Sequence, residues 1–214
     1  MKLTYTIQVC NESRELFSLL NFIIKVKDDE DTIHVVADSN RVTERVEKVL
    51  EYFKEHVHVF MRPFDTFYKN SQFHNDIATG DYIFGLDADE MPQENLIKNV
   101  KNIIRESGAE IICVPRINID PGYTEEFLKR RNYTINELGW INWPDYQMRI
   151  FKKCDHITWT NEMHTKLTGS DKVMGLKADP RVALWHIKSI EKEENRWDDG
   201  SIVTSNDNLY DKLM

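Results

Sequence analysis

Helical and extended patterns alternate along the first 120 residues, and this alternation constrains the fold more than any other feature of the sequence. Helices are expected where apolar residues recur every three or four positions, and strands where short apolar runs lie between turn residues. The expected strands cover 3–9, 32–37, 57–61, 82–86 and 110–119, and the expected helices cover 14–25, 43–55, 71–78 and 93–107. The sequence therefore predicts a doubly wound α/β chain with a mostly parallel central sheet flanked by helices.

Two of the expected strands have distinctive sequences. Residues 82–86 are almost continuously apolar, which is typical of a strand that a parallel sheet buries on both faces. Residues 110–119 contain Pro115. Because proline cannot donate a ladder hydrogen bond, we expect this segment to be an edge strand or one that leaves the sheet.

The character of the sequence changes after residue 120. No repeat or flexible linker separates the two halves, so we expect one domain over 1–190. Its first half would be 1–120 and its second half, a smaller mixed β region that builds the other face of a cleft, 121–190, followed by a tail at 191–214. All five tryptophans fall after residue 120: Trp140, Trp143, Trp159, Trp185 and Trp197.

Composition excludes several classes of protein. A chain of 214 residues with 41% hydrophobic residues can bury a substantial core. The formal net charge is -8 and no basic run is present, which argues against nucleic acid as a partner. No apolar stretch approaches the roughly 18 residues that a membrane-spanning helix needs, and the chain starts directly as a strand, so we expect a cytoplasmic protein. Metal-ligand spacing is absent from the cysteines, which are expected to be free thiols: Cys10, Cys113 and Cys154.

Three acids follow the apolar run at 82–86 within four residues: Asp87, Asp89 and Glu90. The carboxyl ends of parallel strands form the edge at which open α/β sheets bind ligands. Like charges this close together favour a bound cation, and oxygen ligands favour magnesium or manganese, which would bridge a substrate diphosphate. The alternative is that the acids cap the following helix, whose first turn would contain Pro92.

Residues 75–90 read N-D-I-A-T-G-D-Y-I-F-G-L-D-A-D-E and resemble the central motif of family 2 glycosyltransferases, in which an A-x-G-D-Y strand closes in L-D-A-D. Residues 7–12 read I-Q-V-C-N-E and resemble the opening strand and N-E turn of that family, and residues 35–39 resemble its second strand. The three motifs stand in the family's order and cover residues 3–92. His74 departs from the pattern, because the family often has Arg at this position.

The resemblance implies a GT-A fold, which is Rossmann-like, and an enzyme that transfers a sugar from a nucleotide diphosphate sugar, with UDP favoured. The acceptor would be a hydroxyl of a glycan or another molecule, the anomeric centre would be inverted, and Mn2+ or Mg2+ would be the cofactor. Asp89 would bind the metal and Asp87 the ribose or the metal. The full set of nucleotide-sugar-binding residues implied in this way is Cys10, Asn11, Glu12, Asp38, Lys69, Asp87, Ala88, Asp89 and Arg149.

Several of these roles have alternatives. Asn11 and Glu12 would lie beside the base and ribose, but Asn11 or Ser13 followed by Glu15 also suits a helix N-terminus. Asp38 would accept a hydrogen bond from the base, although an aspartate before Ser-Asn is also typical of a turn. Lys69 would supply the positive charge that the missing arginine provides elsewhere in the family.

The second half contains an R-x-F strand at 149–151, a W-x-x-x-x-H segment at 159–164 and a later lone histidine. These features resemble the subset of family 2 related to lipopolysaccharide-core glucosyltransferases. The resemblance implies that His186 completes a metal site with Asp87 and Asp89, whereas a lone histidine on an apolar strand can also be a core residue. Arg149 would hold the donor phosphate or pair with a core acid.

A carboxylate is expected to remove the proton of the acceptor hydroxyl. Glu162 is the first candidate because it lies in the W-x-x-x-x-H segment, and Asp145 is the second. The related subset often has Glu after the histidine, where this chain has Thr165. Trp140, Trp143 and Trp159 can present apolar faces to sugar rings or belong to the core.

Two other classes of protein share parts of this pattern. A nucleotidyltransferase also combines an α/β half with acids and a divalent ion, but it usually carries a glycine-rich, lysine-bearing phosphate loop that is absent here. A non-catalytic nucleotide- or carbohydrate-binding module would keep the apolar frame without needing Asp87 and Asp89. The presence of both acids favours the transferase.

Overall fold

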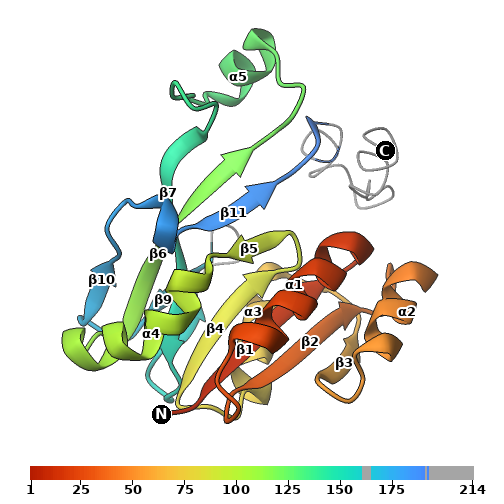
Figure 1. The fold of residues 1–214 in the computed structure, drawn as a ribbon, viewed down its shortest axis with the longest axis vertical. Coiled ribbons are helices and arrows are strands. Elements are labelled where there is room, and N and C mark those ends of the chain that lie inside the picture. Colours follow the sequence, from red (N-terminus) through yellow and green to blue (C-terminus); the bar gives the residue numbers. More distant parts are fainter. Residues whose placement is uncertain (161–164, 191, 193–214) are drawn as a thin grey trace.

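The alternation of patterns produces a central sheet with helices on both faces (Figure 1). A computed structural model of the chain describes residues 1–160, 165–190 and 192. The central sheet contains β1 (Leu3–Val9), β2 (Thr32–Asp38), β3 (His58–Arg62), β4 (Tyr82–Asp87), β5 (Glu90–Pro92), β6 (Ile111–Ile119), β7 (Ile141–Lys152), β10 (Val173–Gly175) and β11 (Leu184–Ile187). The helices are α1 (Ser13–Val26), α2 (Glu44–Tyr52), α3 (Phe67–Ile77), α4 (Glu94–Ser107), α5 (Glu125–Arg131) and a 3-10 turn at Pro180–Val182.

The strand order is β3-β2-β1-β4-β7-β6-β11-β5, with β10 beside β6. The first four strands in this order are parallel, β7 is antiparallel to both of its neighbours, and β6 is parallel to β10 and β11. A mostly parallel sheet was expected, and this prediction is confirmed. The remaining strands, β8 (Thr158–Thr160) and β9 (Lys166–Thr168), form a separate antiparallel pair.

The expectation of an edge strand at 110–119 was wrong, because β6 lies inside the sheet. One side of β6 pairs with β7, and the other pairs with β10 at Ile111–Cys113 and with β11 at Arg116–Ile119. Pro115 lies between the last two stretches. The missing amide of proline therefore falls at the junction of two pairings, where an interior strand tolerates it.

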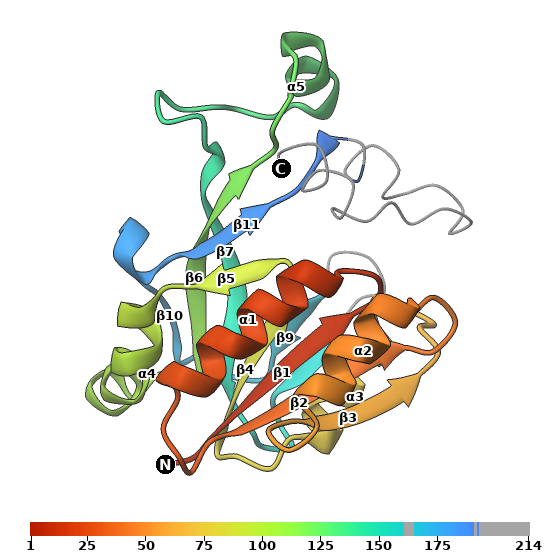
Figure 2. The ribbon, with the colours of Figure 1, turned by 45° about the vertical axis from the view of Figure 1, so that its right-hand side comes forward.

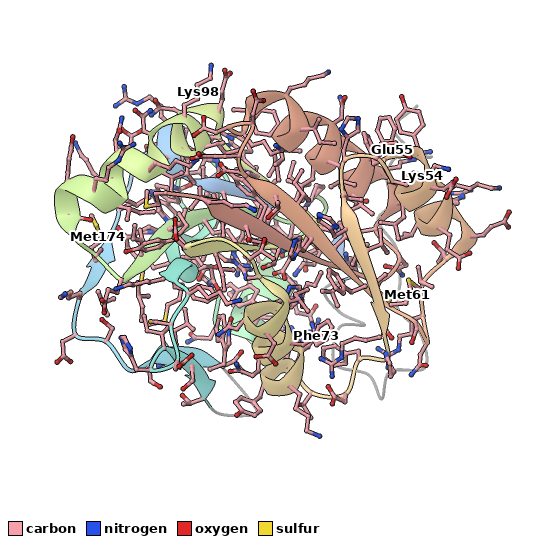
Figure 3. The ribbon with its side chains drawn as sticks, turned by 90° about the horizontal axis from the view of Figure 1, so that it is seen from below. Lys54, Glu55, Met61, Phe73, Lys98 and Met174 are labelled. Atoms are coloured by element: carbon pink, nitrogen blue, oxygen red, sulfur yellow. The ribbon has the colours of Figure 1, made fainter. Side chains whose placement is uncertain are left out.

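Helices α1, α2 and α4 cover one face of the sheet and α3 the other (Figures 2 and 3). The apolar side of α1 repeats with helical spacing at Leu16, Leu19, Leu20 and Ile23, all of which are fully buried. Each such side chain contributes roughly 1.5–3 kcal/mol of transfer free energy when it leaves water.

The face under α3 and β9 is built around Ile83, Phe151 and Leu167. Trp159 is partly buried, packs edge-on against Phe151 of this core and donates to Asn75 Oδ1.

The glycine of the A-x-G-D-Y pattern, Gly80, lies where the backbones of two strands approach closely. A Cβ atom built on Gly80 would lie 2.7 Å from the carbonyl oxygen of Lys2 and 2.8 Å from the backbone of Leu3 and Thr4. Only glycine allows this approach, which brings the start of β4 against the start of β1. The two strands then run parallel, so that their carboxyl ends meet.

Beyond β6 the chain forms an arm that carries α5 away from the sheet and returns along β7 (Figure 1). Phe127, Leu128 and Ile141 form a small core of their own. Near the base of the arm, Trp140 lies edge-on to Trp143 and Trp185, with ring centroids 5.2 and 6.4 Å apart. Three tryptophans of the second half thus form this cluster and Trp159 packs against the core, while Trp197 lies outside the described residues.

Two expectations from composition concern the whole chain. All three cysteines are free, as expected. Among the helices that the structure describes, none combines the length and apolar character needed to cross a membrane.

Candidate active site at the carboxyl edge of the sheet

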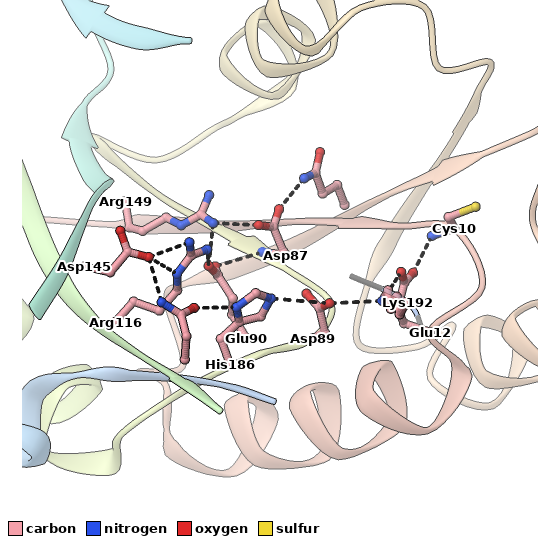
Figure 4. A network of polar contacts seen from close by, with 12 residues as sticks. Cys10, Glu12, Asp87, Asp89, Glu90, Arg116, Asp145, Arg149, His186 and Lys192 are labelled. Carbon is pink, nitrogen blue, oxygen red and sulfur yellow. Dashed lines mark hydrogen bonds and ion pairs between the residues drawn. The ribbon is translucent and has the colours of Figure 1, made fainter. Parts of the chain in front are cut away.

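The parallel pairing of β1 and β4 brings two acidic segments together. Gln8 pairs with Asp87, and the amide of Ala88 donates to the carbonyl oxygen of Gln8 at 3.0 Å. The turn after β1, which contains Glu12, therefore lies beside Asp87 at the end of β4 and Asp89 in the turn that follows (Figure 4). This is the edge at which the sequence predicted a ligand site.

Both carboxylate oxygens of Asp87 have partners in the protein. Gln8 Nε2 donates to Oδ1. Arg149 Nη2 donates to Oδ2 at 2.6 Å. Burial alone would raise the pKa of Asp87, but the Arg149 guanidinium outweighs it and lowers the pKa. Of the two roles left open for Arg149, the structure shows the pairing with a core acid.

Glu90 is the most deeply buried acid of the site, with its side chain fully covered. Its Oε1 accepts from Arg149 Nη2 at 2.5 Å and from Arg116 Nη1 at 2.8 Å. Its Oε2 accepts from the amide of Asp87 at 3.2 Å. The helix-cap alternative for these acids is wrong, since Glu90 begins β5, and α4 starts four residues later, after Gln93.

Asp145 is enclosed by donors. Its Oδ2 accepts from Arg116 Nη2 at 2.6 Å and from Asn118 Nδ2 at 2.9 Å, and its Oδ1 accepts from Gln147 Nε2 at 2.8 Å. Burial would raise the pKa of Asp145, but these donors, Arg116 above all, lower it. A carboxylate held in this way binds a proton weakly, which disfavours it as a general base.

His186 lies on β11 opposite Glu90 of β5, and its two ring nitrogens face different groups. Because Asn118 Nδ2 donates to Asp145, the Asn118 Oδ1 atom faces His186 Nδ1, 2.8 Å away, and must accept from it. His186 Nε2 lies 3.6 Å from Asp89 Oδ2. Burial, partly opposed by Asp89, lowers the pKa of His186.

Asp89 and Glu12 share a lysine. Lys192 Nζ lies 3.0 Å from Asp89 Oδ2 and 2.7 Å from Glu12 Oε1. Glu12 Oε2 accepts from the amides of Cys10 and Asn11 at 2.9 and 3.0 Å. Burial would raise the pKa of Asp89, but Lys192 and then His186 hold it well below its ordinary value.

The helix-cap alternative at the start of α1 also differs from the structure. Glu12 is the residue before the first turn of α1, but its side chain makes no capping hydrogen bond. Its carboxylate instead turns back to the amides that precede it and toward the end of β4. The turn after β1 therefore directs a charge into the site rather than into the helix.

Other predicted residues lie apart from this network or outside the description. Asp38 Oδ1 accepts from the amides of Asn40 and Phe64 at 3.1 Å, as a turn residue does. The Lys69 side chain is exposed and lies 3.6 Å from Asp65. Cys10 contributes its amide, while burial and the nearby Glu12 raise the pKa of its thiol to about 12. Glu162 falls outside the residues that the structure describes.

The predicted metal set is only partly brought together. Asp89 and His186 face each other, whereas Asp87 is turned to Gln8 and Arg149. Within residues 1–160, 165–190 and 192, no group of three or more histidine, cysteine, aspartate or glutamate side chains is arranged to hold an ion.

Sequence reasoning missed four side chains of the network: Gln8, Arg116, Asn118 and Lys192. Arg116 and Asn118 had a detectable signal, since residues two apart on a strand share a face and both are polar in an otherwise apolar segment. Lys192 had none, because it follows the last strand in a run of charged residues with no periodic pattern.

Comparisons with known proteins agree with this architecture. A sequence family described as Glycosyl transferase family 2 matches residues 6–167. The structure of S. aureus TarS 1-349 in complex with UDP-GlcNAc superposes with a TM-score of 0.61 at 15% identity, covering 88% of this chain and 59% of TarS 1-349. The corresponding UDP complex gives a TM-score of 0.58 at 10% identity, covering 88% and 61%. At such identities the likeness concerns the fold, and this chain spans less than two thirds of those structures. No curated protein matches the chain.

Proposed function

Because the chain belongs to glycosyl transferase family 2 and has the GT-A fold, we propose that it transfers a sugar from a nucleotide diphosphate sugar to a hydroxyl acceptor. The facing pair of Asp89 and His186 at the carboxyl edge of the sheet carries this proposal. The donor would be UDP-linked, and the structures of S. aureus TarS with UDP-GlcNAc and UDP support that choice. The nucleotide would lie over the ends of β1, β2 and β4.

A divalent ion, Mn2+ or Mg2+, is the proposed cofactor, and the residues present fit it. His186 Nε2 and Asp89 Oδ2 lie 3.6 Å apart, and an imidazole nitrogen beside a carboxylate oxygen suits two ligands of one cation. Asn118 holds the other ring nitrogen, as an outer-shell partner of a metal-bound histidine does. When bound, the ion would neutralise the charge that develops on the departing diphosphate.

The charge of the network supports the same proposal. Five carboxylates stand against three cationic side chains: Glu12, Asp87, Asp89, Glu90 and Asp145 against Arg116, Arg149 and Lys192. The negative charge remains in excess when the nearby Lys188, which also lowers the pKa of Asp89, is counted. Such a site attracts a cation before it can accept a diphosphate.

We assign base catalysis to Glu162 in preference to Asp145, with inversion at the anomeric carbon. The support is the environment of Asp145, whose oxygens accept from three side chains and whose pKa is lowered. Asp145 would instead fix Arg116, which in turn holds Glu90. Asp87 and Arg149 would act as one ion pair beside the ribose and diphosphate.

The acceptor would be a glycan or another molecule with a free hydroxyl. The R-x-F strand, the tryptophan-to-histidine segment and His186 support a place in the subset related to lipopolysaccharide-core glucosyltransferases. The cluster of Trp140, Trp143 and Trp185 at the base of the arm offers aromatic faces to a sugar. We propose residues 121–190 as the acceptor side and 1–120 as the donor side of one domain.

The test is release of nucleotide diphosphate from a panel of UDP- and GDP-sugars, with Mn2+ or with chelator, for the parent chain, Asp89→Ala and Asp76→Asn. Asp76 is an exposed acid on α3 that accepts from Gln72, so its variant controls for the loss of a surface carboxylate. The proposal expects release that requires both Mn2+ and Asp89 and is unchanged in Asp76→Asn. Nucleotide binding without release in the parent chain, whatever the metal, would instead indicate a binding module.

A further inference from the structure

Lys192 is a cation that belongs to the chain yet lies in the proposed metal environment (Figure 4). Its side chain is only 11% exposed, and its Nζ lies between the carboxylates of Glu12 and Asp89 at 2.7 and 3.0 Å. The amide of Lys192 donates to Ser189 Oγ at 3.1 Å, which ties this residue to the end of β11. Glu12 follows β1 and Asp89 follows β4, and Lys192 contacts the carboxylates of both.

Lys192 and the proposed ion would use the same atom. Asp89 Oδ2 is the oxygen nearest to His186 Nε2, at 3.6 Å, and it is also the oxygen that contacts Lys192, at 3.0 Å. An ion bound by Asp89 and His186 would therefore share its carboxylate oxygen with an ammonium group. Two cations so close together repel each other strongly in a buried site.

We propose that Lys192 is the resident cation of this site and that a divalent ion bound by Asp89 and His186 displaces its ammonium group from Asp89. Lys192 thereby sets the affinity of the chain for the ion. This inference rests on the metal part of the proposed function. It assigns a positioning role to Lys192, which acts through Asp89 and does not itself bind the ion.

Two properties of the site follow from this exchange. Without metal, Lys192 keeps Glu12 and Asp89 from repelling each other, so the edge of the sheet holds its shape while empty of an ion. With metal, the released ammonium remains tethered near Glu12, whose Oε1 is its second partner. The exchange therefore leaves a positive charge beside the turn after β1.

The experiment measures Mn2+ binding by the loss of the electron paramagnetic resonance signal of free Mn2+, with and without UDP. The variants are Lys192→Met, which keeps the length of the side chain but removes its charge, and Lys192→Arg, which keeps the charge. Asp89→Asn removes the shared carboxylate, and Lys98→Met changes an exposed lysine of α4 that pairs with Glu94. Circular dichroism establishes that each variant is folded.

We expect Lys192→Met to bind Mn2+ at least about 10-fold more tightly than the parent chain, because removing a competing cation leaves Asp89 free for the ion. Lys192→Arg and Lys98→Met should stay within about 2-fold of the parent chain, since both leave the competing charge in place. In chelator the melting temperature of Lys192→Met should fall below that of the parent chain, and Mn2+ should raise it by more than it raises the parent's. A purely structural role for Lys192 would lower the melting temperature without tightening Mn2+ binding.

Equal or weaker Mn2+ binding by Lys192→Met, with binding lost in Asp89→Asn, would overturn the exchange and leave the metal part of the proposed function intact. Binding that is unchanged in Asp89→Asn would overturn both, because Asp89 would then not be a ligand. Absence of Mn2+ binding in every variant, with and without UDP, would also overturn both.

Discussion

Two lysines at opposite ends of the sheet are surrounded by acids, yet only one of them lies in a candidate site. Lys101 on α4 lies 2.7 to 2.8 Å from Asp28, Glu30 and Asp31 at the amino end of the strands. Lys192 lies 2.7 and 3.0 Å from Glu12 and Asp89 at the carboxyl end. Both lysine side chains are 11% exposed, so the burial of the lysine does not distinguish the two clusters.

The difference lies in where the acids come from and what else they face. The partners of Lys101 all belong to the loop between α1 and β2, and two of them are more than half exposed. The partners of Lys192 follow two separate strands, and one of them, Asp89, faces Nε2 of His186. Density of charge therefore does not identify a ligand site. The proposed site differs from the Lys101 cluster in its position at the carboxyl ends of the strands and in the histidine that faces one of its acids.

The largest effect is expected from Asp89→Ala. We expect the rate of sugar transfer to fall at least about 1,000-fold, because loss of a metal ligand removes the stabilisation of charge on the leaving diphosphate. The measurement is steady-state transfer with Mn2+, normalised to folded protein. If the rate falls by less than about 10-fold, Asp89 does not belong to the catalytic machinery. The acids around Lys192 and those around Lys101 would then be alike in this respect.

The same substitution in the other cluster should act on stability alone. Asp31→Ala removes an acid that is 1% exposed and that accepts from both Lys101 and the amide of Leu3 at 2.8 Å. We expect the free energy of unfolding to fall by about 2–4 kcal/mol, since a buried amide and an ammonium lose their partner. Urea unfolding measures this loss, and transfer per folded molecule should be unchanged. Loss of transfer comparable to that of Asp89→Ala would remove the contrast between the two ends.

Particular residues show why the sequence predicted the acids of the site but not the side chains that pair with them. The apolar run at 82–86 and the acids after it fixed both the strand and its direction, because a buried parallel strand has few alternatives. In the structure, Gly80 lets the start of β4 approach the start of β1, with which it pairs in parallel. The arginines that pair with Asp87 and Glu90 come instead from β7 and β6. No local pattern encodes the antiparallel insertion of β7 between β4 and β6. Pro115 was misread for the same reason, since its tolerance depends on which strands end beside it.

An effect of intermediate size is expected for the dependence of the unfolding free energy on pH, through His74. Burial lowers the pKa of His74 to about 4, and its ring nitrogens lack hydrogen-bond partners among the described residues. An unfolded histidine has a pKa near 6.5, so the unfolded state binds more protons between these values. The contribution of neutral His74 to the free energy of unfolding is therefore fully present above about pH 6.5 and is lost as the pH falls toward 4.

This histidine alone should cost about 2 kcal/mol of unfolding free energy between pH 7.5 and pH 5. His74→Leu, which cannot titrate, should reduce that loss by a similar amount. Urea unfolding at the two pH values measures it. An unchanged pH dependence in His74→Leu would show that other groups, such as the buried His34, whose pKa burial also lowers to about 4, carry the effect.

The smallest effect is expected from Glu30→Gln. Glu30 is 56% exposed and contributes one of three acids around Lys101, and an exposed ion pair contributes little. We expect the melting temperature to change by no more than about 1 °C and transfer to be unchanged. Differential scanning fluorimetry measures the first quantity. A larger fall would mean that the amino-end cluster depends on all three acids rather than on Asp31.

The order of synthesis gives the Glu12 to Lys192 contact another consequence. The two residues lie 180 positions apart, and Lys192 follows Asp89 by 103 positions. A ribosome adding roughly 5–20 residues per second needs roughly 5–20 s to pass from Asp89 to Lys192. During that interval β1, β2 and β4 already exist on the nascent chain, while Glu12 and Asp89 still lack Lys192. Lys192 is thus supplied by translation well after the strands whose acids it neutralises.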